Sequence, residues 1–247
     1  MFDSHCHPTD LEDAESLVEA CVAQGIGLLA CGYHRDSCLA VLGLRRRFPS
    51  LPVALGVHPW HCAEGWEEIL AMIRREHPAA IGEVGLDGWD EAMRATLPEQ
   101  RLCLQAQLQL ALELGLPVTL HSRRALQPLQ EVVRDFPGLR GALHAYGGSL
   151  QQAEWWLARG FYFGLGGAVT RPDAHRQRRL ATGLPLDRLL LETDLPAIGQ
   201  QGIAPEAVRP WDLRRVAETV ATLRGVPEAQ LVEATDRNSR ALFVASR

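Results

Sequence analysis

Two histidines stand two positions apart in the segment Asp3-Ser4-His5-Cys6-His7, near the start of the printed sequence. On an extended strand, residues i and i+2 point to the same face, so His5 and His7 can bind one metal ion together. A polar strand end with incidental histidines explains this short motif equally well. The case for a metal site therefore depends on further ligands elsewhere in the chain.

Four more residues of ligand type each follow a short apolar run. They are Glu83 after Ala80-Ile81-Gly82, His121 after Pro117-Val118-Thr119-Leu120, His144 after Gly141-Ala142-Leu143, and Asp194 shortly after Leu189-Leu190-Leu191. A salt bridge could explain Glu83, a helix cap Asp194, and a hydrogen-bonded core position either histidine. A buried carboxylate must nevertheless be paired or coordinated. Because the four residues occur together with His5 and His7, we interpret all six as metal ligands.

Four histidines and two carboxylates suit a pair of divalent zinc, manganese or magnesium ions. Such a pair, roughly 3.5–4 Å apart, generates a hydroxide and stabilises the attacking and leaving oxygens of a hydrolysis. The chain contains no lysine that could be carboxylated to bridge two ions. We therefore predict that Glu83 bridges them and that Asp194 is the general base, which makes these two the catalytic carboxylates.

Short apolar runs that alternate with segments of helical period indicate the elements that must position these ligands. The expected strands are residues 1–6, 26–31, 52–56, 80–83, 117–121, 141–145, 161–164 and 188–192, and the expected helices include residues 10–24, 66–76, 98–114, 150–159 and 210–224. Eight strands with intervening helices predict a single (β/α)8 TIM barrel, an α/β fold, over residues 1–247.

An open, doubly wound sheet is the alternative fold. It would spread the six predicted ligands along an edge, whereas a closed barrel brings the carboxyl ends of its strands together. No GxGxxG motif follows the first expected strand to support dinucleotide binding. The position of the ligands therefore favours the barrel.

Composition excludes several classes of protein. A net charge of −5 argues against a broad basic surface for duplex nucleic acid. The sequence has neither a run of 18 apolar residues nor a charged leader followed by an apolar stretch, so we expect no membrane span and no signal peptide. The six cysteines form no CxxC pair, and we expect free buried thiols. These features predict a cytoplasmic protein, and we expect a monomer without an obligatory partner.

Five motifs in this order resemble the TatD-type family of metal-dependent deoxyribonucleases, and within it the YjjV-like branch of bacterial hydrolases. The motifs are the segment 3–7, Gly56-Val57-His58-Pro59, residues 81–87, Leu120-His121-Ser122-Arg123 and residues 191–196. The resemblance runs nearly end to end, and the family it points to lies within the wider amidohydrolase-like barrel superfamily. It implies the same six metal ligands, His5, His7, Glu83, His121, His144 and Asp194, and hydrolysis of phosphodiester bonds in DNA.

The sequence departs from the family pattern after His144, at Gly88-Trp89 and at Val208-Arg209-Pro210. These departures concern the choice of substrate and leave the predicted ligands intact. An amidohydrolase or lactonase acting on a small-molecule C–O or C–N bond is therefore an alternative function, and a non-catalytic scaffold is a second one. The complete ligand set argues against the scaffold.

Several residues near the expected strand ends could contact a substrate. We predict that His58, Arg123 and Arg209 bind it, because a guanidinium suits phosphate and His58 follows the third strand. A structural role for His58 is nearly as reasonable. Trp60 and Trp89 could stack on a base or could simply pack in their loops.

Overall fold

A computed structural model describes residues 1–63 and 65–244 of the chain. Eight strands form one sheet in which the spatial order is the order along the chain. The strands are β1 (Phe2–Cys6), β2 (Gly27–Gly32), β3 (Val53–Leu55), β4 (Ala80–Asp87), β5 (Val118–Arg123), β6 (Gly141–Leu143), β7 (Tyr162–Leu165) and β8 (Leu189–Leu191). The pairs β1–β2, β3–β4, β4–β5, β5–β6 and β7–β8 are parallel.

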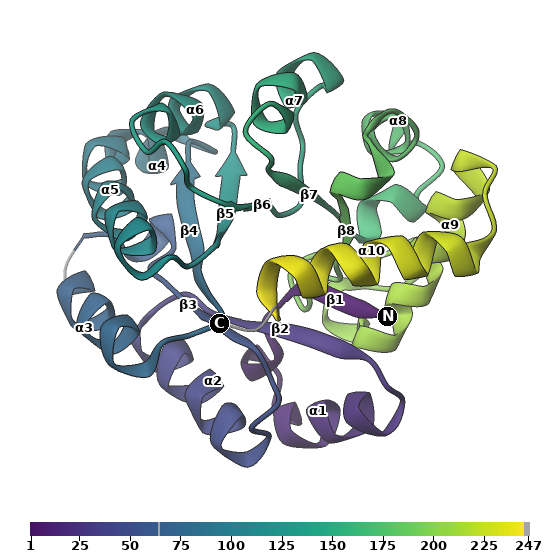
Figure 1. Ribbon diagram of the computed structural model, residues 1–247, viewed down its shortest axis with the longest axis horizontal. Helices are drawn as coiled ribbons and strands as arrows, with labels where there is room; N and C mark the ends of the chain where they lie inside the picture. The colour runs from purple at the N-terminus through teal and green to yellow at the C-terminus, as the bar shows by residue number, and fades with distance from the viewer. Residues whose placement is uncertain (64, 245–247) are drawn as a thin grey trace. The chain divides into compact units, whose positions relative to one another are not determined.

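Helices alternate with these strands (Figure 1). The α-helices are α1 (Ala14–Ala23), α2 (Arg35–Arg47), α3 (Trp66–Glu76), α4 (Glu91–Ala95), α5 (Leu97–Leu114), α6 (Leu126–Arg134), α7 (Leu150–Leu157), α8 (His175–Gly183), α9 (Leu213–Arg224) and α10 (Glu228–Phe243). A parallel sheet with sequential strand order and a helical crossover between strands is the topology of a (β/α)8 barrel. A doubly wound sheet reverses its strand order, so the alternative fold is excluded.

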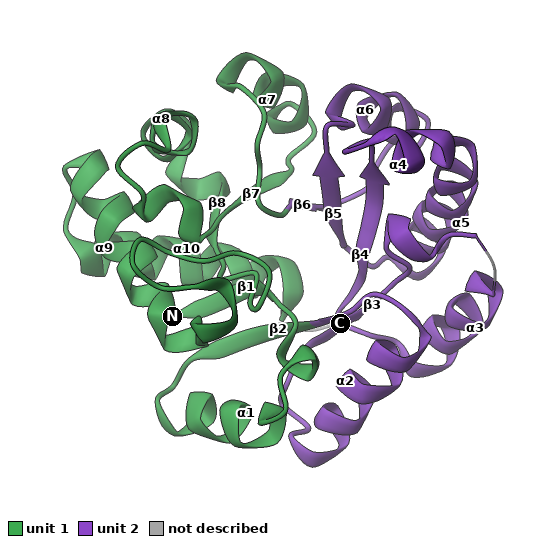
Figure 2. Ribbon diagram, turned by 180° about the vertical axis from the view of Figure 1, so that it is seen from behind, with its two compact units in different colours: residues 1–30, 144–247 green, residues 31–143 purple. Residues whose placement is uncertain are grey.

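The chain divides into two compact units, which Figure 2 shows in different colours. Unit 1 comprises residues 1–30 and 144–247, and unit 2 comprises residues 31–143. Each unit contains several strands with the helices that cover them, and each is described separately below.

Unit 1 brings the first and the last strand of the sheet side by side. The amide of Asp194 donates to the carbonyl of His5 at 3.0 Å, and the amide of His7 donates to the carbonyl of Leu195 at 2.9 Å. Helix α10 packs against both β1 and β8. Adjacent first and last strands are what closure of a barrel requires.

Unit 2 is organised around the long strand β4, whose eight residues are all buried. β4 pairs with β5 so that Gly85 lies opposite His121. A side chain at Gly85 could not be accommodated, because a Cβ atom there would lie 2.0 Å from the carbonyl oxygen of His121. Glycine at this position therefore lets β4 approach the strand that carries His121.

The predicted elements agree with the structure in type and differ at their ends. β4 continues to Asp87, past the predicted end at Glu83. The Glu83 side chain is only 5% exposed, so this polar residue does not mark the point where the strand reaches solvent. β6 ends at Leu143, two residues early, since Ala145 adopts a left-handed φ of 42° that no strand accommodates. The helix predicted over residues 10–24 begins only at Ala14, after a 3₁₀ turn at Pro8–Asp10, and the one predicted over residues 210–224 begins with a 3₁₀ turn at Pro210–Asp212 before α9.

Two predictions from composition can also be compared with the structure. All six cysteines are free and buried, as expected. Within residues 1–63 and 65–244, no helix is long and apolar enough to cross a membrane.

Candidate metal centre

Unit 1 contains a group of possible metal ligands at the carboxyl ends of β1 and β8. His5, His7 and Asp194 are buried, and one potential ligand atom from each lies within 4.8 Å of the others. The two Nε2 atoms are 3.2 Å apart, and they lie 3.7 Å (His5) and 3.6 Å (His7) from Oδ1 of Asp194. Two imidazoles and a carboxylate at these separations can converge on one divalent ion.

His144 joins this group directly after β6. Its ring stacks on the ring of His5, with the centroids 4.0 Å apart and an angle of 9° between the planes. Burial would raise the pKa of Asp194, but the hydrogen bond with His7 and the charges of His144 and His5 lower it below its usual value. Asp194 is therefore ionised at neutral pH, as both a metal ligand and a general base must be.

A buried carboxylate on β1 fixes the turn that carries Asp194. Asp3 accepts hydrogen bonds from both the amide and the hydroxyl of Thr193. Burial raises the pKa of Asp3 to about 7, although the two donors of Thr193 oppose that rise. Asp194 follows with a left-handed φ of 51°, a conformation that aspartate tolerates better than most residues. Asp3 thus holds the main chain beside the ligand.

Glu192 performs the corresponding task beside His144. Its buried carboxylate accepts the amide of Ala145, the residue that follows this histidine. Gly164 on β7 leaves the space that the carboxylate occupies, since a Cβ atom there would lie 2.0 Å from Oε2 of Glu192. Ala145 is held in its left-handed conformation by this hydrogen bond.

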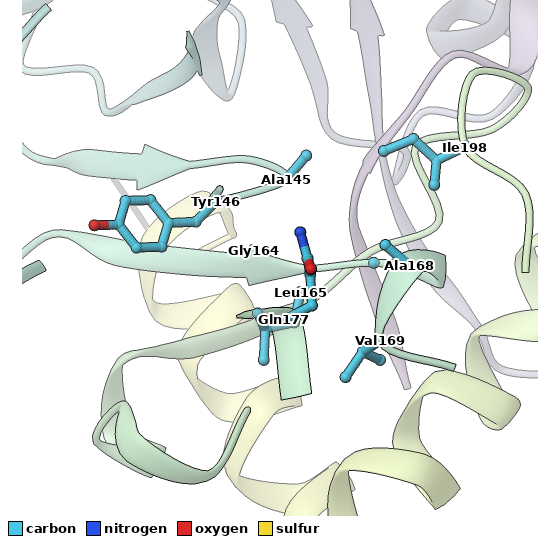
Figure 3. A pocket seen from close by; sticks show the side chains of 9 residues that line it. Ala145, Tyr146, Gly164, Leu165, Ala168, Val169, Gln177 and Ile198 are labelled. Carbon is cyan, nitrogen blue, oxygen red and sulfur yellow. The ribbon is translucent and has the colours of Figure 1, made fainter. Parts of the chain in front are cut away.

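A small cavity of about 80 Å³ opens beside Ala145 in unit 1 (Figure 3). It is lined by Ala145, Tyr146, Gly164, Leu165, Gly166, Ala168, Val169, Gln177 and Ile198. Most of these residues are apolar, and Ala145 connects the cavity to the segment that carries His144. The cavity therefore belongs to the surroundings of the unit 1 ligands.

Unit 2 contains a second ligand group, with residues within β4, within β5 and shortly after β3. His58, Glu83 and His121 each offer one ligand atom within 4.8 Å of the others. Oε1 of Glu83 lies 2.8 Å from Nδ1 of His121 and 3.4 Å from Nε2 of His58. His58 is only 3% exposed, so the structure places this predicted substrate contact among potential metal ligands.

Asp87 lies on the other side of the His121 ring. Its Oδ2 atom is 3.6 Å from Nε2 of His121, and a carboxylate on the second ring nitrogen is the usual partner of a metal-binding histidine. Burial would raise the pKa of Asp87, but hydrogen bonds from His121, Trp60 and Trp89 lower it to about 2. Burial would lower the pKa of His121, but Asp87 and Glu83 raise it to about 9.

Two buried glutamines of α5 hold the strand ends that carry these residues. Gln107 accepts the amide of Val57 at 2.7 Å and donates to the carbonyl of the same residue at 3.2 Å. Gln100 makes the same pair of bonds with Asp87, at 2.8 and 3.0 Å. Val57 immediately precedes His58, so each glutamine fixes the main chain at or beside a site residue.

The remaining predicted residues lie at the surface of their units. Arg123 is exposed at the end of β5, and Arg209 is partly buried in the loop before α9. The guanidinium of Arg209 donates to the carbonyls of Glu206 and Val208, so it also closes its own loop. Whether Arg123 and Arg209 bind substrate stays a prediction.

Five residues with these supporting roles are not among the residues predicted from the sequence: Asp3, Asp87, Glu192, Gln100 and Gln107. The motifs contain the three carboxylates, and their position next to ligand-type residues was the available signal. The glutamines give no signal in the sequence, because their importance depends on which strand end α5 covers.

The raised pKa of His121 leads to a prediction for the metal-free protein. We expect its imidazole to titrate near pH 9 in histidine NMR spectra, and the substitution Asp87→Asn to lower that midpoint because it removes a negative partner. The protonated imidazole stabilises the fold fully below its unfolded pKa of about 6.5. That contribution to the free energy of unfolding is lost as the pH rises through about 9. An unchanged midpoint in Asp87→Asn would show that Asp87 does not act on His121.

The hydrogen bonds of Gln107 lead to a second prediction. Gln107→Leu leaves the buried amide and carbonyl of Val57 without this partner, so we expect urea unfolding to report a loss of about 2–4 kcal/mol. Gln109→Leu, on the exposed face of the same helix, is the matched control and should change stability by less than about 0.5 kcal/mol. Equal stability of the two variants would contradict the role given to Gln107.

Comparison with known proteins gives the family. A model described as TatD related DNase matches residues 2–244. YjjV of Escherichia coli K12, described as an uncharacterized metal-dependent hydrolase, is 34% identical over 98% of this chain and 97% of its own. The protein of Salmonella typhimurium described as the 3'-5' ssDNA/RNA exonuclease TatD is 33% identical over 98% of each chain.

A solved structure supports the same assignment. The crystal structure of YjjV from Escherichia coli K12 superposes with a TM-score of 0.89 at 32% identity, over 100% of this chain and 98% of that one. The fold and the resemblance predicted from the sequence are therefore confirmed. The chain belongs to the TatD related DNase family.

Proposed function

We propose that the protein is a divalent-metal-dependent hydrolase of phosphodiester bonds, a deoxyribonuclease that acts on single-stranded DNA or on DNA ends. The observation that carries the proposal is the presence of two ligand groups, His5–His7–Asp194 in unit 1 and His58–Glu83–His121 in unit 2. Relatives described as metal-dependent hydrolase and as ssDNA/RNA exonuclease support it.

The donor set fits divalent ions. Each group combines two imidazoles with one carboxylate, the ligand types that zinc and manganese accept, and magnesium would favour the carboxylates. Burial makes each carboxylate costly unless a cation or a donor compensates it. When bound, divalent ions supply a Lewis acid that polarises a phosphoryl group and makes water more acidic. We infer two ions for the residues of the two groups together.

The chain's own residues would orient the substrate and move the proton. Asp194, ionised at neutral pH, accepts a proton from the attacking water, and Glu83 is the second catalytic carboxylate. His144 stacks on His5 and keeps its ring in position as a further ligand. His58, Arg123 and Arg209 remain our candidates for contact with the substrate. A cytoplasmic monomer without an obligatory partner is part of the same proposal.

The nuclease function predicts stepwise cleavage of an end-labelled single strand. We expect none after chelation, and recovery on addition of magnesium, manganese or zinc. Glu83→Gln and His144→Asn should each lower kcat/KM by at least about a hundredfold, because each removes a ligand or catalytic group. His175→Ala, an exposed histidine of α8, is the control and should keep full activity.

A metal-loaded protein that cleaves no strand would contradict the nuclease function. Esters, lactones and amides of small molecules would then be the substrates to test, since the same donor set can serve those reactions.

A further inference from the structure

We propose that Trp60, Trp89, Arg123 and Arg124 form a subsite in unit 2 for one nucleotide of a single strand, with its phosphate on the two arginines and its base on Trp60. The inference rests on the proposed nuclease function and names the part of the substrate that these residues hold.

The guanidinium groups of Arg123 and Arg124 both pack against the indole ring of Trp89. The guanidinium carbons of Arg123 and Arg124 lie 3.7 and 4.0 Å from its ring centroid. Two planar groups this close to one centroid would overlap on the same face, so they cover opposite faces. Trp89 is therefore a spacer between two cations, and its faces are not available to a base.

Local backbone geometry builds this arrangement. Arg124 has a left-handed φ of 52° directly after the last residue of β5. It also donates to the carbonyl of Trp89 at 3.1 Å, and the amide of Gly88 donates to the carbonyl of Arg123 at 2.8 Å. These two hydrogen bonds connect the end of β5 to the segment that follows β4.

The stacked arginines are suited to phosphate. A guanidinium that lies over an aromatic ring contacts it with its face, so the N–H donors along its edge can still bind a phosphate. One donor of Arg124 is already used by the carbonyl of Trp89. Both arginines are exposed. Their orientation is fixed before any ligand binds, so less side-chain entropy is lost when a phosphate is held.

Trp60 offers an exposed aromatic surface next to the ligand group. It is 55% exposed, and its ring meets that of His58 edge-on, with the centroids 4.5 Å apart. Its Nε1–H donates to Oδ2 of Asp87 at 2.8 Å, which fixes the indole in place. A large aromatic side chain that stays exposed while a partly buried hydrogen bond holds it is suited to stack on a base.

One carboxylate connects these parts to the candidate metal centre. Oδ1 of Asp87 accepts the amide of Trp89 at 2.8 Å, and Oδ2 binds Trp60 and lies 3.6 Å from His121. Asp87 therefore contacts Trp60, Trp89 and the potential metal ligand His121 at the same time. A strand held by this subsite would lie next to the His58–Glu83–His121 group.

Binding of a short, fluorescently labelled oligothymidylate to the metal-free protein tests the subsite without relying on catalysis. The comparison probe is a strand of equal length with abasic sites, and fluorescence anisotropy gives Kd for both. We expect Trp60→Ala to weaken binding of the normal strand roughly tenfold and to leave the abasic strand unchanged. Trp60→Phe keeps an aromatic face and should restore most of the affinity.

The arginines are tested by the dependence of binding on salt. Loss of one phosphate contact lowers the slope of log K against log salt by about 0.7 for a single strand. We expect this decrease for Arg123→Gln and for Arg124→Gln, and none for Trp60→Ala. Arg134→Gln, an exposed arginine of α6, is the matched control and should keep the wild-type slope.

Two results would overturn the proposal. The first is a ratio of Kd values for the normal and abasic strands that is the same in Trp60→Ala as in the wild type. The second is a slope of log K against log salt that is unchanged in Arg123→Gln and Arg124→Gln. Cleavage by the metal-loaded wild type separates this subsite from the nuclease function. A strand that is cut with the same KM by Trp60→Ala contradicts the subsite alone. A strand that is bound through these residues but never cut contradicts the nuclease function alone.

Discussion

Hydrogen bonds from buried polar side chains to the main chain at the strand ends are the constraint on which the candidate metal centre depends. Asp3 and Glu192 hold Thr193 and Ala145 in unit 1. Gln107 and Gln100 hold Val57 and Asp87 in unit 2, as described above. In each case the residue that is held is next to a ligand or is itself the partner of one. Loops at the mouth of a barrel are otherwise the least ordered part of the fold, so these bonds decide where the imidazoles and carboxylates point.

The same burial sets the electrostatics of the two ligand groups. Imidazoles lower the pKa of Asp194, and carboxylates raise the pKa of His121 to about 9. In the metal-free protein each charge is thus compensated by its neighbour. A divalent cation can take over that compensation, and it must displace the proton of His121 to do so, because only the neutral imidazole is a ligand. The arrangement explains how so many ionisable groups can be buried together.

The sequence predicted the type of chemistry better than it predicted the residues that hold the ligands in position. Ligand-type residues after apolar runs predicted the barrel topology, since the carboxyl ends of parallel strands share one edge. The structure brings five of the six predicted ligands into the two groups, and the sixth, His144, stacks on His5. His58, predicted to contact substrate, also lies beside Glu83 and His121, a position that the sequence did not indicate. Trp89 was considered for base stacking, and no pattern in the chain shows that two arginines cover its faces. Gln100 and Gln107 resemble any polar residue of an amphipathic helix until their neighbours are known.

The central claim is that the protein holds two divalent ions through the residues of these two ligand groups. Metal content after equilibrium dialysis, measured by inductively coupled plasma mass spectrometry, tests it most directly. We predict about two equivalents for the wild type and about one each for His7→Asn and His121→Asn, because each substitution disrupts one group. One equivalent in the wild type, or two in either variant, would contradict the claim.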